Sequence, residues 1–382
     1  INKAQQATGD YDNAQKAEQE LLGEIEGYIE YAGKTAPIPE GYTKSQITTE
    51  DDVAEGLVIY EIPEGATVNW TDEEDENGNN QSTITIGDTT TNLQETVNQY
   101  VWIPVEDINS MVMCESNSGT SQCNLVYDEE EDTLTCTTHP DTATELVGRL
   151  YTTTYTSTTE GDNTIYTYEM DFTKRDQTYT EGSGHHEPNT VSYDADNSLT
   201  IEQLKSDFTA MAKSVAKNGG FYISRYEVGE GGNSKKGQAV LTAGSSDGSN
   251  YLGANMWYGL YNSIRKIDEN KQMIWGCQYD QVIKFIKENG EDPENGHCDR
   301  NLTTNHALSG QNELDKMKNI YDLEGNHWEW TLEAYSTGDR TGRSNDYRSV
   351  NNGNFYPTSG RYSDHYPAFA NNNRSSRSVL YL

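Results

Sequence analysis

The stretch Asp322-Leu323-Glu324-Gly325-Asn326-His327-Trp328-Glu329-Trp330 combines a turn signal with two tryptophans. Gly-Asn pairs are typical of turns, because both residues accept backbone conformations that other residues avoid. Trp328 and Trp330 are large apolar side chains suited to a core. We therefore predict a tight turn at Gly325-Asn326 that leads into a buried segment.

Two carboxylates, Asp322 and Glu329, stand on either side of this turn. Hard cations take carboxylate and backbone carbonyl oxygens as ligands, so one interpretation is a Ca²⁺ site. The alternative is that Asp322 caps the turn and Glu329 pairs with a nearby arginine.

Apolar periodicity predicts the elements around this stretch. Continuous apolar or aromatic runs indicate buried strands at 100–105, 221–228 and 379–382. Three- and four-residue spacing indicates helices over 199–218 and 278–289. Alternating Thr and Tyr runs at 150–158 and 164–172, with a polar tip between them, predict a hairpin.

Four of these stretches resemble motifs of the formylglycine-generating-enzyme family, a branch of the C-type-lectin fold. The similar stretches are, in the family's order, Tyr100–Val105, Phe221–Val228, the G-N-x-W-E-W motif at Gly325–Trp330, and the last strand at Arg377–Leu382. The resemblance implies an α+β fold with a C-type-lectin-like domain. It also implies a Ca²⁺ site at Asp322, Gly325, His327 and Glu329, where the middle two residues contribute backbone oxygens.

The sequence departs from that family at the catalytic site. The enzymes carry a cysteine pair shortly before the last strand, but no cysteine lies between Ser344 and Ser378. A thiolate nucleophile or copper ligand has no substitute there. A histidine-rich iron triad of the related sulfoxide synthases is not visible either. We therefore expect a protein that is not an enzyme and uses no organic cofactor.

The stretch from Ser344 to Ser378 is rich in Asn, Ser, Tyr, Gly and Arg, and it contains no Lys, Glu, Leu, Ile, Met or Trp. It resembles the diversified C-terminal region of the variable proteins of bacterial diversity-generating retroelements. Such a composition suits a binding face, because Tyr supplies rigid contact area and Ser and Asn supply adaptable hydrogen bonds. The alternative is a static polar surface loop.

The resemblance implies a set of exposed ligand-binding side chains on an apolar frame of Trp328, Trp330, Val350 and Val379. We expect Tyr347, Arg361, Tyr362 and Tyr366 to contribute most of the binding energy. The full set is Ser344, Asp346, Tyr347, Arg348, Asn351, Asn352, Tyr356, Arg361, Tyr362, Asp364, His365, Tyr366, Phe369, Asn371 and Asn373.

Residues 1–34 carry an apolar stripe at helical spacing, and we predict one helix that Gly33 ends. The segment resembles the part of type IV pilin-like proteins that follows their hydrophobic stalk, which implies an anchoring segment upstream of Ile1. The predicted organisation is a pilin-like N-terminal helix (1–34), a β-rich connecting region (35–97) and a C-type-lectin-like domain (98–382). That domain holds a β-rich insertion at about 113–185 and the variable region at 344–378.

Composition excludes several classes of protein. The chain has 382 residues, with 27 Lys+Arg against 62 Asp+Glu, for a net charge of −35. A polyanion is repelled by phosphate backbones, so nucleic acid is excluded as a partner. The 26 Tyr and 6 Trp argue against disorder. The five cysteines leave at least one thiol free or paired with another chain, and one or two surface disulfides would favour an extracytoplasmic location. If the protein is exported, we expect Cys277 and Cys298 to form a disulfide.

Together these observations predict a non-enzymatic, surface-displayed ligand-binding protein, extracellular and held at a cell surface. Its partner would be a protein or glycan at a cell or phage surface, and its N-terminal helix would contact other pilin subunits. One alternative is a structural pilin-like subunit with a static lectin-like head. Another is an oxidase of the formylglycine-generating type.

Overall fold

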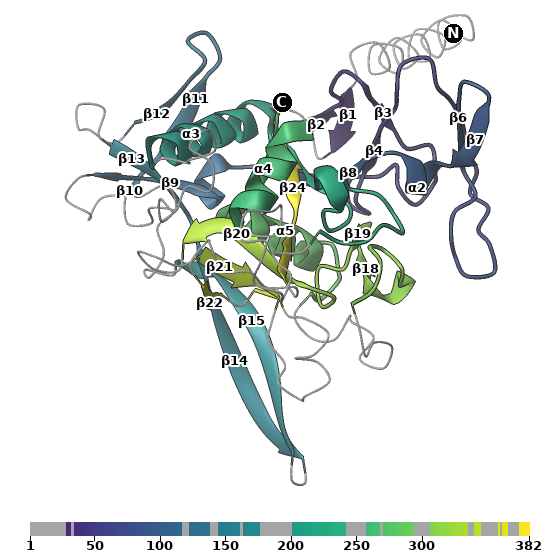
Figure 1. Ribbon diagram of the computed structural model, residues 1–382. Helices are drawn as coiled ribbons and strands as arrows, with labels where there is room; N and C mark the ends of the chain where they lie inside the picture. The colour runs from purple at the N-terminus through teal and green to yellow at the C-terminus, as the bar shows by residue number, and fades with distance from the viewer. Residues whose placement is uncertain are drawn as a thin grey trace, which may run out of the picture.

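The computed structural model (Figure 1) covers most of the chain. It describes residues 28–31, 34–116, 122–137, 144–160, 163–175, 201–241, 257–267, 270–293, 306–334, 340–344, 358–359, 361–365 and 374–382. The described part is a mixed α+β structure in which sheets predominate, as the sequence predicts. None of the helices in these ranges combines the length and the hydropathy of a membrane span.

A six-stranded antiparallel sheet forms the centre of the molecule. Its strands lie in the order β17 (Lys271–Met273), β24 (Ser378–Leu380), β16 (Gly220–Ser224), β8 (Gln99–Pro104), β4 (Val58–Glu61) and β3 (Tyr42–Lys44). The chain's last strand is therefore an inner strand. β3 and β4 come from the predicted connecting region, yet they pair directly into this sheet.

Strand β8 is buried on both faces, which explains its unbroken apolar run. Val101 and Ile103 face the main core, whereas Tyr100 and Trp102 face a smaller cluster with Tyr222. Alternate side chains of a strand point to opposite faces, so both faces need apolar residues here. The predicted strand at 100–105 is confirmed.

Three helices pack on this core. They are α3 (Ile201–Asn218), α4 (Trp257–Ile267) and α5 (Gly276–Glu288). Gly219, with φ of +74°, ends α3. A Cβ on Gly220 would lie 2.4 Å from the Ile103 carbonyl oxygen, so the Gly-Gly pair lets the chain turn directly into β16. The predicted helices over 199–218 and 278–289 are confirmed within a few residues.

The region before β8 contains small sheets. They are β1 (Tyr28–Tyr31) with β2 (Lys34–Pro37), and β5 (Thr67–Asn69), β6 (Thr83–Ile86) and β7 (Thr89–Asn92), followed by the short helix α2 (Leu93–Thr96). The predicted helix through residue 34 is wrong at Tyr28–Tyr31, which is a strand. Two aromatics and an isoleucine between Gly27 and Gly33 favour a strand there. Residues 1–27 lie outside the described residues.

The insertion after β8 is β-rich. A short 3-10 helix, η1 (Ile108–Ser110), leads into β9 (Val112–Ser116), β10 (Gln122–Cys123), β11 (Leu125–Asp128), β12 (Thr133–Cys136) and β13 (Thr144–Gly148). The predicted hairpin follows as β14 (Tyr151–Glu160) and β15 (Asn163–Arg175), and it extends away from the rest of the molecule (Figure 1).

The C-terminal part builds a second, four-stranded sheet in the order β22 (Tyr362–His365), β21 (Arg340–Arg343), β20 (Trp328–Ala334) and β23 (Arg374–Ser376). β20 and β23 run parallel. The small ladder β18 (Lys316–Met317) and β19 (Ile320–Tyr321) precedes it, and two 3-10 helices, η3 (Glu230–Gly232) and η4 (Glu313–Asp315), complete the described elements.

The cysteines differ from the predicted pairing. Cys277 is a buried thiol in α5 rather than half of a disulfide, so the predicted Cys277–Cys298 bridge is wrong. Cys298 lies outside the described residues. Cys136, in β12, is disulfide-bonded.

Candidate ligand-binding site

Residues 322–327, which precede the two tryptophans, form a tight turn between β19 and β20. Asp322, Gly325 and Asn326 all have positive φ, of +57°, +98° and +51°. Trp330 is fully buried and Trp328 nearly so. The predicted turn followed by core tryptophans is therefore confirmed.

Three carboxylates are buried behind this turn. The Asp322 carboxylate accepts a 2.7 Å hydrogen bond from the Gly310 backbone N–H. The Glu329 carboxylate lies 2.5 Å from Nε of Arg377. Glu227 accepts a 2.6 Å hydrogen bond from the Asn326 side chain, and its other oxygen lies 3.3 Å from Nδ1 of His327.

Burial raises the pKa of all three carboxyl groups. It raises the pKa of Glu227 and Glu329 to about 8 and that of Asp322 to about 7, although the Arg377 guanidinium pulls all three down. Burial disfavours the charged form, and one guanidinium shared by three acids compensates only in part. Arg377 pairs closely with Glu329, so we assign the retained proton chiefly to Glu227.

These contacts match the ion-pair alternative better than a Ca²⁺ cage. Asp322 and Glu329 both engage donors of the protein, and a cation bound to Glu329 would lie beside the Arg377 guanidinium. In the part of the chain that the structure describes, no group of three or more His, Cys, Asp or Glu is arranged to hold a metal. Of the two interpretations we favour the ion pair, and Ca²⁺ binding at Asp322, Gly325, His327 and Glu329 stays an untested alternative.

A second buried cluster holds the four-stranded sheet to α5. Arg343 lies 2.5 Å from Asp280 and 3.3 Å from Glu333. Arg361 pairs with the same two acids, at 2.8 Å from Glu333 and also closely with Asp280. Arg361 also donates a 2.8 Å hydrogen bond to the carbonyl of Tyr151, where β14 begins. Two arginines and two acids thus bring the helix, the sheet and the hairpin together.

Other polar residues of the predicted variable region are buried as well. Ser344 accepts a 3.4 Å hydrogen bond from the Gly325 backbone N–H, and Thr358 donates a 2.6 Å bond to the Pro293 carbonyl. The hydroxyl of Ser359 accepts from Thr153 of β14 at 2.9 Å. Arg374 lies over the Trp328 ring, 5.2 Å from its centre. We call this set the anchor residues: Ser344, Thr358, Ser359, Arg361 and Arg374.

Two predicted binding residues are therefore corrected. Ser344 is fully buried, and the Arg361 side chain is only 4% exposed, so neither is an exposed contact residue. Both are polar residues inside the protein, where partners offset the cost of leaving water. Sequence composition cannot separate such residues from surface ones.

The remaining predicted residues are placed only in part. For Tyr362, Asp364 and His365 the structure gives the backbone of β22 and not the side chains. The others lie outside the described residues: Asp346, Tyr347, Arg348, Asn351, Asn352, Tyr356, Tyr366, Phe369, Asn371 and Asn373. The same holds for Val350 of the predicted frame, whereas Val379 is buried in the core.

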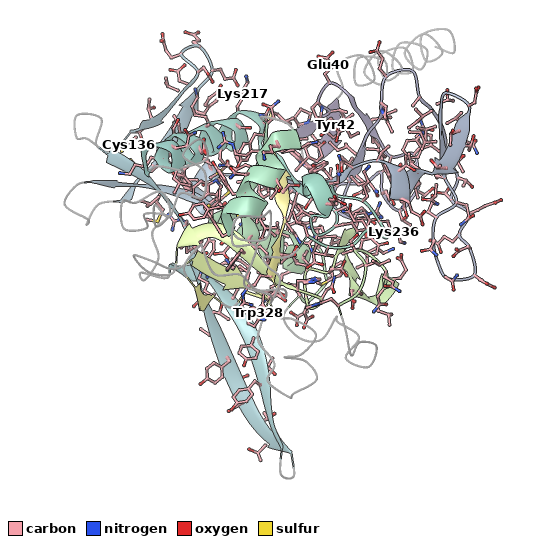
Figure 2. The ribbon with its side chains drawn as sticks, viewed as in Figure 1. Glu40, Tyr42, Cys136, Lys217, Lys236 and Trp328 are labelled. Carbon is pink, nitrogen blue, oxygen red and sulfur yellow. The ribbon has the colours of Figure 1, made fainter. Side chains whose placement is uncertain are left out.

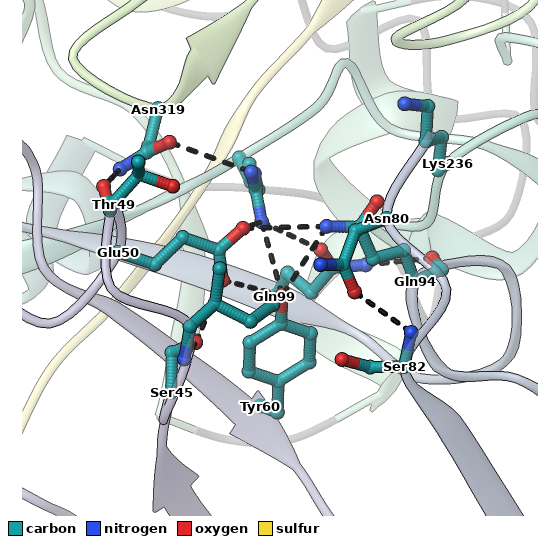
Figure 3. Close-up of polar contacts among 12 residues, drawn as sticks. Ser45, Thr49, Glu50, Tyr60, Asn80, Ser82, Gln94, Gln99, Lys236 and Asn319 are labelled. Carbon is teal, nitrogen blue, oxygen red and sulfur yellow. Dashed lines mark hydrogen bonds and ion pairs between the residues drawn. The ribbon is translucent and has the colours of Figure 1, made fainter. Parts of the chain in front are cut away.

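A third polar network, which the sequence analysis missed, holds the segment 49–56 against the central sheet (Figure 3). Arg225, fully buried after β16, lies 2.7 Å from Glu50 and donates 3.1 and 3.2 Å hydrogen bonds to Tyr60 and Gln99. Asn319 donates hydrogen bonds to three carbonyls of the segment 49–56. These partners are far apart in sequence, so no local pattern reveals them.

Comparisons with known proteins give weak likenesses. No protein-family model and no curated protein matches the chain. Among solved structures it is similar to three variants titled Major Tropism Determinant. The I1 variant is 10% identical with a TM-score of 0.34, covering 93% of this chain and 85% of that one. The M1 variant is 9% identical with the same TM-score and coverage. The U1 variant is 8% identical with a TM-score of 0.33, covering 95% and 87%.

Proposed function

We propose that the chain is a non-enzymatic ligand-binding protein whose binding face is formed by the segments 345–357 and 366–373, called here the intervening segments. The proposal includes display at a cell or phage surface, with a protein or glycan as ligand. The C-type-lectin-like fold, diversification by a retroelement and the pilin-like anchor belong to the same proposal.

One observation carries this proposal. Each described side chain from Ser344 to Ser378 is buried or, for Arg361, nearly so, and its polar groups are held by distant parts of the chain. The chain is thus fixed on both sides of each intervening segment. Within those segments the sequence contains seven Asn, three Tyr and two Phe.

A buried set of anchor residues with separate polar and aromatic segments between them suits a binding surface. The anchor residues hold the ends of the intervening segments through interactions that do not depend on what the segments contain. Aromatic and amide side chains then supply the contact area and adaptable hydrogen bonds that binding loops use. The segments can therefore change without loss of the fold.

The test compares two variants of the full chain on arrays of glycans and on a panel of intact bacterial cells. In the first variant, Tyr347, Arg348, Tyr356 and Tyr366 are replaced by serine. The control replaces two exposed apolar residues outside the intervening segments, Val126→Ser and Leu314→Ser, and should bind like the parent. We expect the first variant to lose any binding that the parent shows and to keep its melting temperature. Binding that survives in the first variant would contradict the proposal.

A further inference from the structure

Lys271 is a lysine whose side chain is completely buried. It lies in β17, at one edge of the central sheet. Its Nζ lies over the rings of Tyr100 and Tyr42, 5.4 and 5.7 Å from their centres, and Tyr42 is labelled in Figure 2. Lysine is almost never fully buried unless it is paired, and a buried amine can act as a nucleophile when a neighbouring group takes its proton. The groups around this amine therefore decide what it can do.

The amine contacts a carboxylate and, through it, an amide. Nζ of Lys271 donates a 2.8 Å hydrogen bond to Oε2 of Glu61, at the end of β4. The same oxygen accepts a 2.8 Å hydrogen bond from Nδ2 of Asn98, the residue before β8. The Glu61 backbone N–H also donates to the Asn98 carbonyl at 3.0 Å, which holds the two residues side by side. A single carboxylate oxygen thus separates the lysine amine from the side-chain amide.

The Asn98 amide is held at both of its polar atoms. Its Oδ1 accepts a 2.8 Å hydrogen bond from the Ser234 backbone N–H, while its Nδ2 donates to Glu61. A donor at the carbonyl oxygen stabilises the negative charge that develops there when a nucleophile attacks the carbonyl carbon. Asn98 is only 8% exposed, whereas the Glu61 side chain is 35% exposed. Water therefore has little access to the amide, and a small leaving group can reach solvent past the carboxylate.

An ion pair alone does not require this arrangement. A buried lysine needs a carboxylate to offset its charge, and Glu61 meets that need. It does not need an amide that shares the same carboxylate oxygen and has a backbone donor at its carbonyl. A nucleophile, a group that can move protons and a polarised carbonyl are instead held in contact, which is the requirement for reaction between an amine and an amide.

We propose that Nζ of Lys271 joins Cγ of Asn98 in an isopeptide bond within the chain, and that Glu61 moves the protons. Glu61 takes a proton from the ammonium group, the neutral amine attacks Cγ, and the bond from Cγ to Nδ2 breaks. The lysine nitrogen gives up two protons in all, and both leave on the departing nitrogen as ammonium. The reaction is neither an oxidation nor a reduction and needs no further reactant.

The bond joins distant parts of the chain. It links the edge strand β17 to the start of β8, and β24 and β16 lie between these two strands in the central sheet. It also closes a long loop that contains the β-rich insertion, the hairpin and α3. Such a link restricts the unfolded chain and keeps both ends of the loop attached when a protease cuts within it. The inference does not depend on the ligand-binding proposal, because it uses none of the intervening segments.

The intact mass of the purified full chain, measured after reduction of its disulfides, tests this. We expect it to lie below the mass of the sequence by one molecule of ammonia. Glu95 and Glu106 flank Asn98, and Glu269 and Glu288 flank the peptide that contains Lys271. Digestion with a protease that cleaves after glutamate should therefore give 96–106 and 270–288 as one branched product.

Glu61→Gln tests the role of the carboxylate, because the amide keeps the size of the side chain but cannot take up the proton. This variant should have the full mass of its sequence and give two separate peptides. The control Glu64→Gln, at an exposed position three residues later, should form the bond like the parent. The mass of the parent decides on the bond itself, whether or not the Glu61 variant folds.

Two results would overturn the proposal. One is a folded parent chain with the full mass of its sequence, or with an ammonia loss that maps to other residues. The other is a branched product that forms equally well in Glu61→Gln.

Discussion

Arg361 joins three parts of the chain through one side chain. It pairs with Asp280 of α5 and Glu333 of β20, and it donates to the Tyr151 carbonyl at the start of the hairpin. Replacing it with methionine should lower the free energy of unfolding by about 3–5 kcal/mol, because buried carboxylates lose part of their counter-charge. Urea denaturation followed by tryptophan fluorescence measures this loss.

The control for that variant is Lys266→Met, at an exposed position of α4, which should change stability by no more than about 0.5 kcal/mol. Equal effects of the two substitutions would show that Arg361 is not part of the frame.

Glu227 should make the protein less stable as pH rises. Its pKa is about 8 in the folded protein, against about 4.3 for an unperturbed glutamate. Between these values the folded state binds more protons than the unfolded state, so stability is fully present at the acidic end and is lost as pH approaches 8. Melting temperatures from pH 5 to 8 should therefore fall, and Glu227→Gln should flatten the decline.

The same melting temperatures as a function of pH distinguish an ion pair between Glu329 and Arg377 from a Ca²⁺ ion bound to Glu329. Metal ligands must be deprotonated, so a bound Ca²⁺ would make stability rise with pH and with added calcium. We expect neither calcium nor a chelator to move the melting temperature. A calcium-dependent rise that Glu329→Gln abolishes would restore the metal site.

At the scale of elements, the segment 49–56 docks on the turn between β18 and β19 so closely that only glycine fits at position 56. Gly56 has φ of +91°, and a Cβ there would lie 2.0 Å from the Lys318 carbonyl oxygen. Gly56→Ala should therefore cost more than the roughly 1–3 kcal/mol of backbone strain alone.

Gly65 is the matched control, because it has φ of +78° and nothing within 4 Å of its added Cβ. Thermal unfolding of both alanine variants isolates the cost of the close approach. Similar losses in the two variants would mean that the segment can move away from Lys318.

Strongly patterned elements were predictable from sequence, and weakly patterned ones were not. The apolar run of β8, the stripe of α3 and the Thr/Tyr alternation of β14–β15 each carry a local signal. α4 was missed because its buried face is made of Trp257, Leu260, Tyr261 and Ile264. That spacing is helical, but three of the first five residues of α4 are aromatic, and aromatic residues favour strands.

The candidate site was less predictable than the elements. Asp280, Glu333, Arg343 and Arg361 meet only after folding, and nothing in their local sequence distinguishes them from surface charges. The composition of 344–378 indicated a polar binding region, but it could not show that Ser344 and Arg361 belong to the frame.

For the whole molecule, we propose that a buried polar frame carries two segments, 345–357 and 366–373, whose sequences can change. The central sheet, α5 and the four-stranded sheet are joined by the Arg343–Arg361 cluster and by Arg377, which lies between β23 and β24. Exposed substitutions usually change stability by within about 0.5 kcal/mol, whereas loss of a buried polar partner costs several times more. Substitutions in the intervening segments should therefore change the stability of the protein much less than substitutions of the anchor residues.

The most direct measurement is a scan of every single substitution from Arg340 to Arg377, scored by resistance of the folded protein to protease. We predict that the intervening segments, 345–357 and 366–373, accept most residues. We also predict that the anchor residues Ser344, Thr358, Ser359, Arg361 and Arg374 accept few. Equal sensitivity across both sets would contradict the separation of frame and binding face, and with it the proposed function.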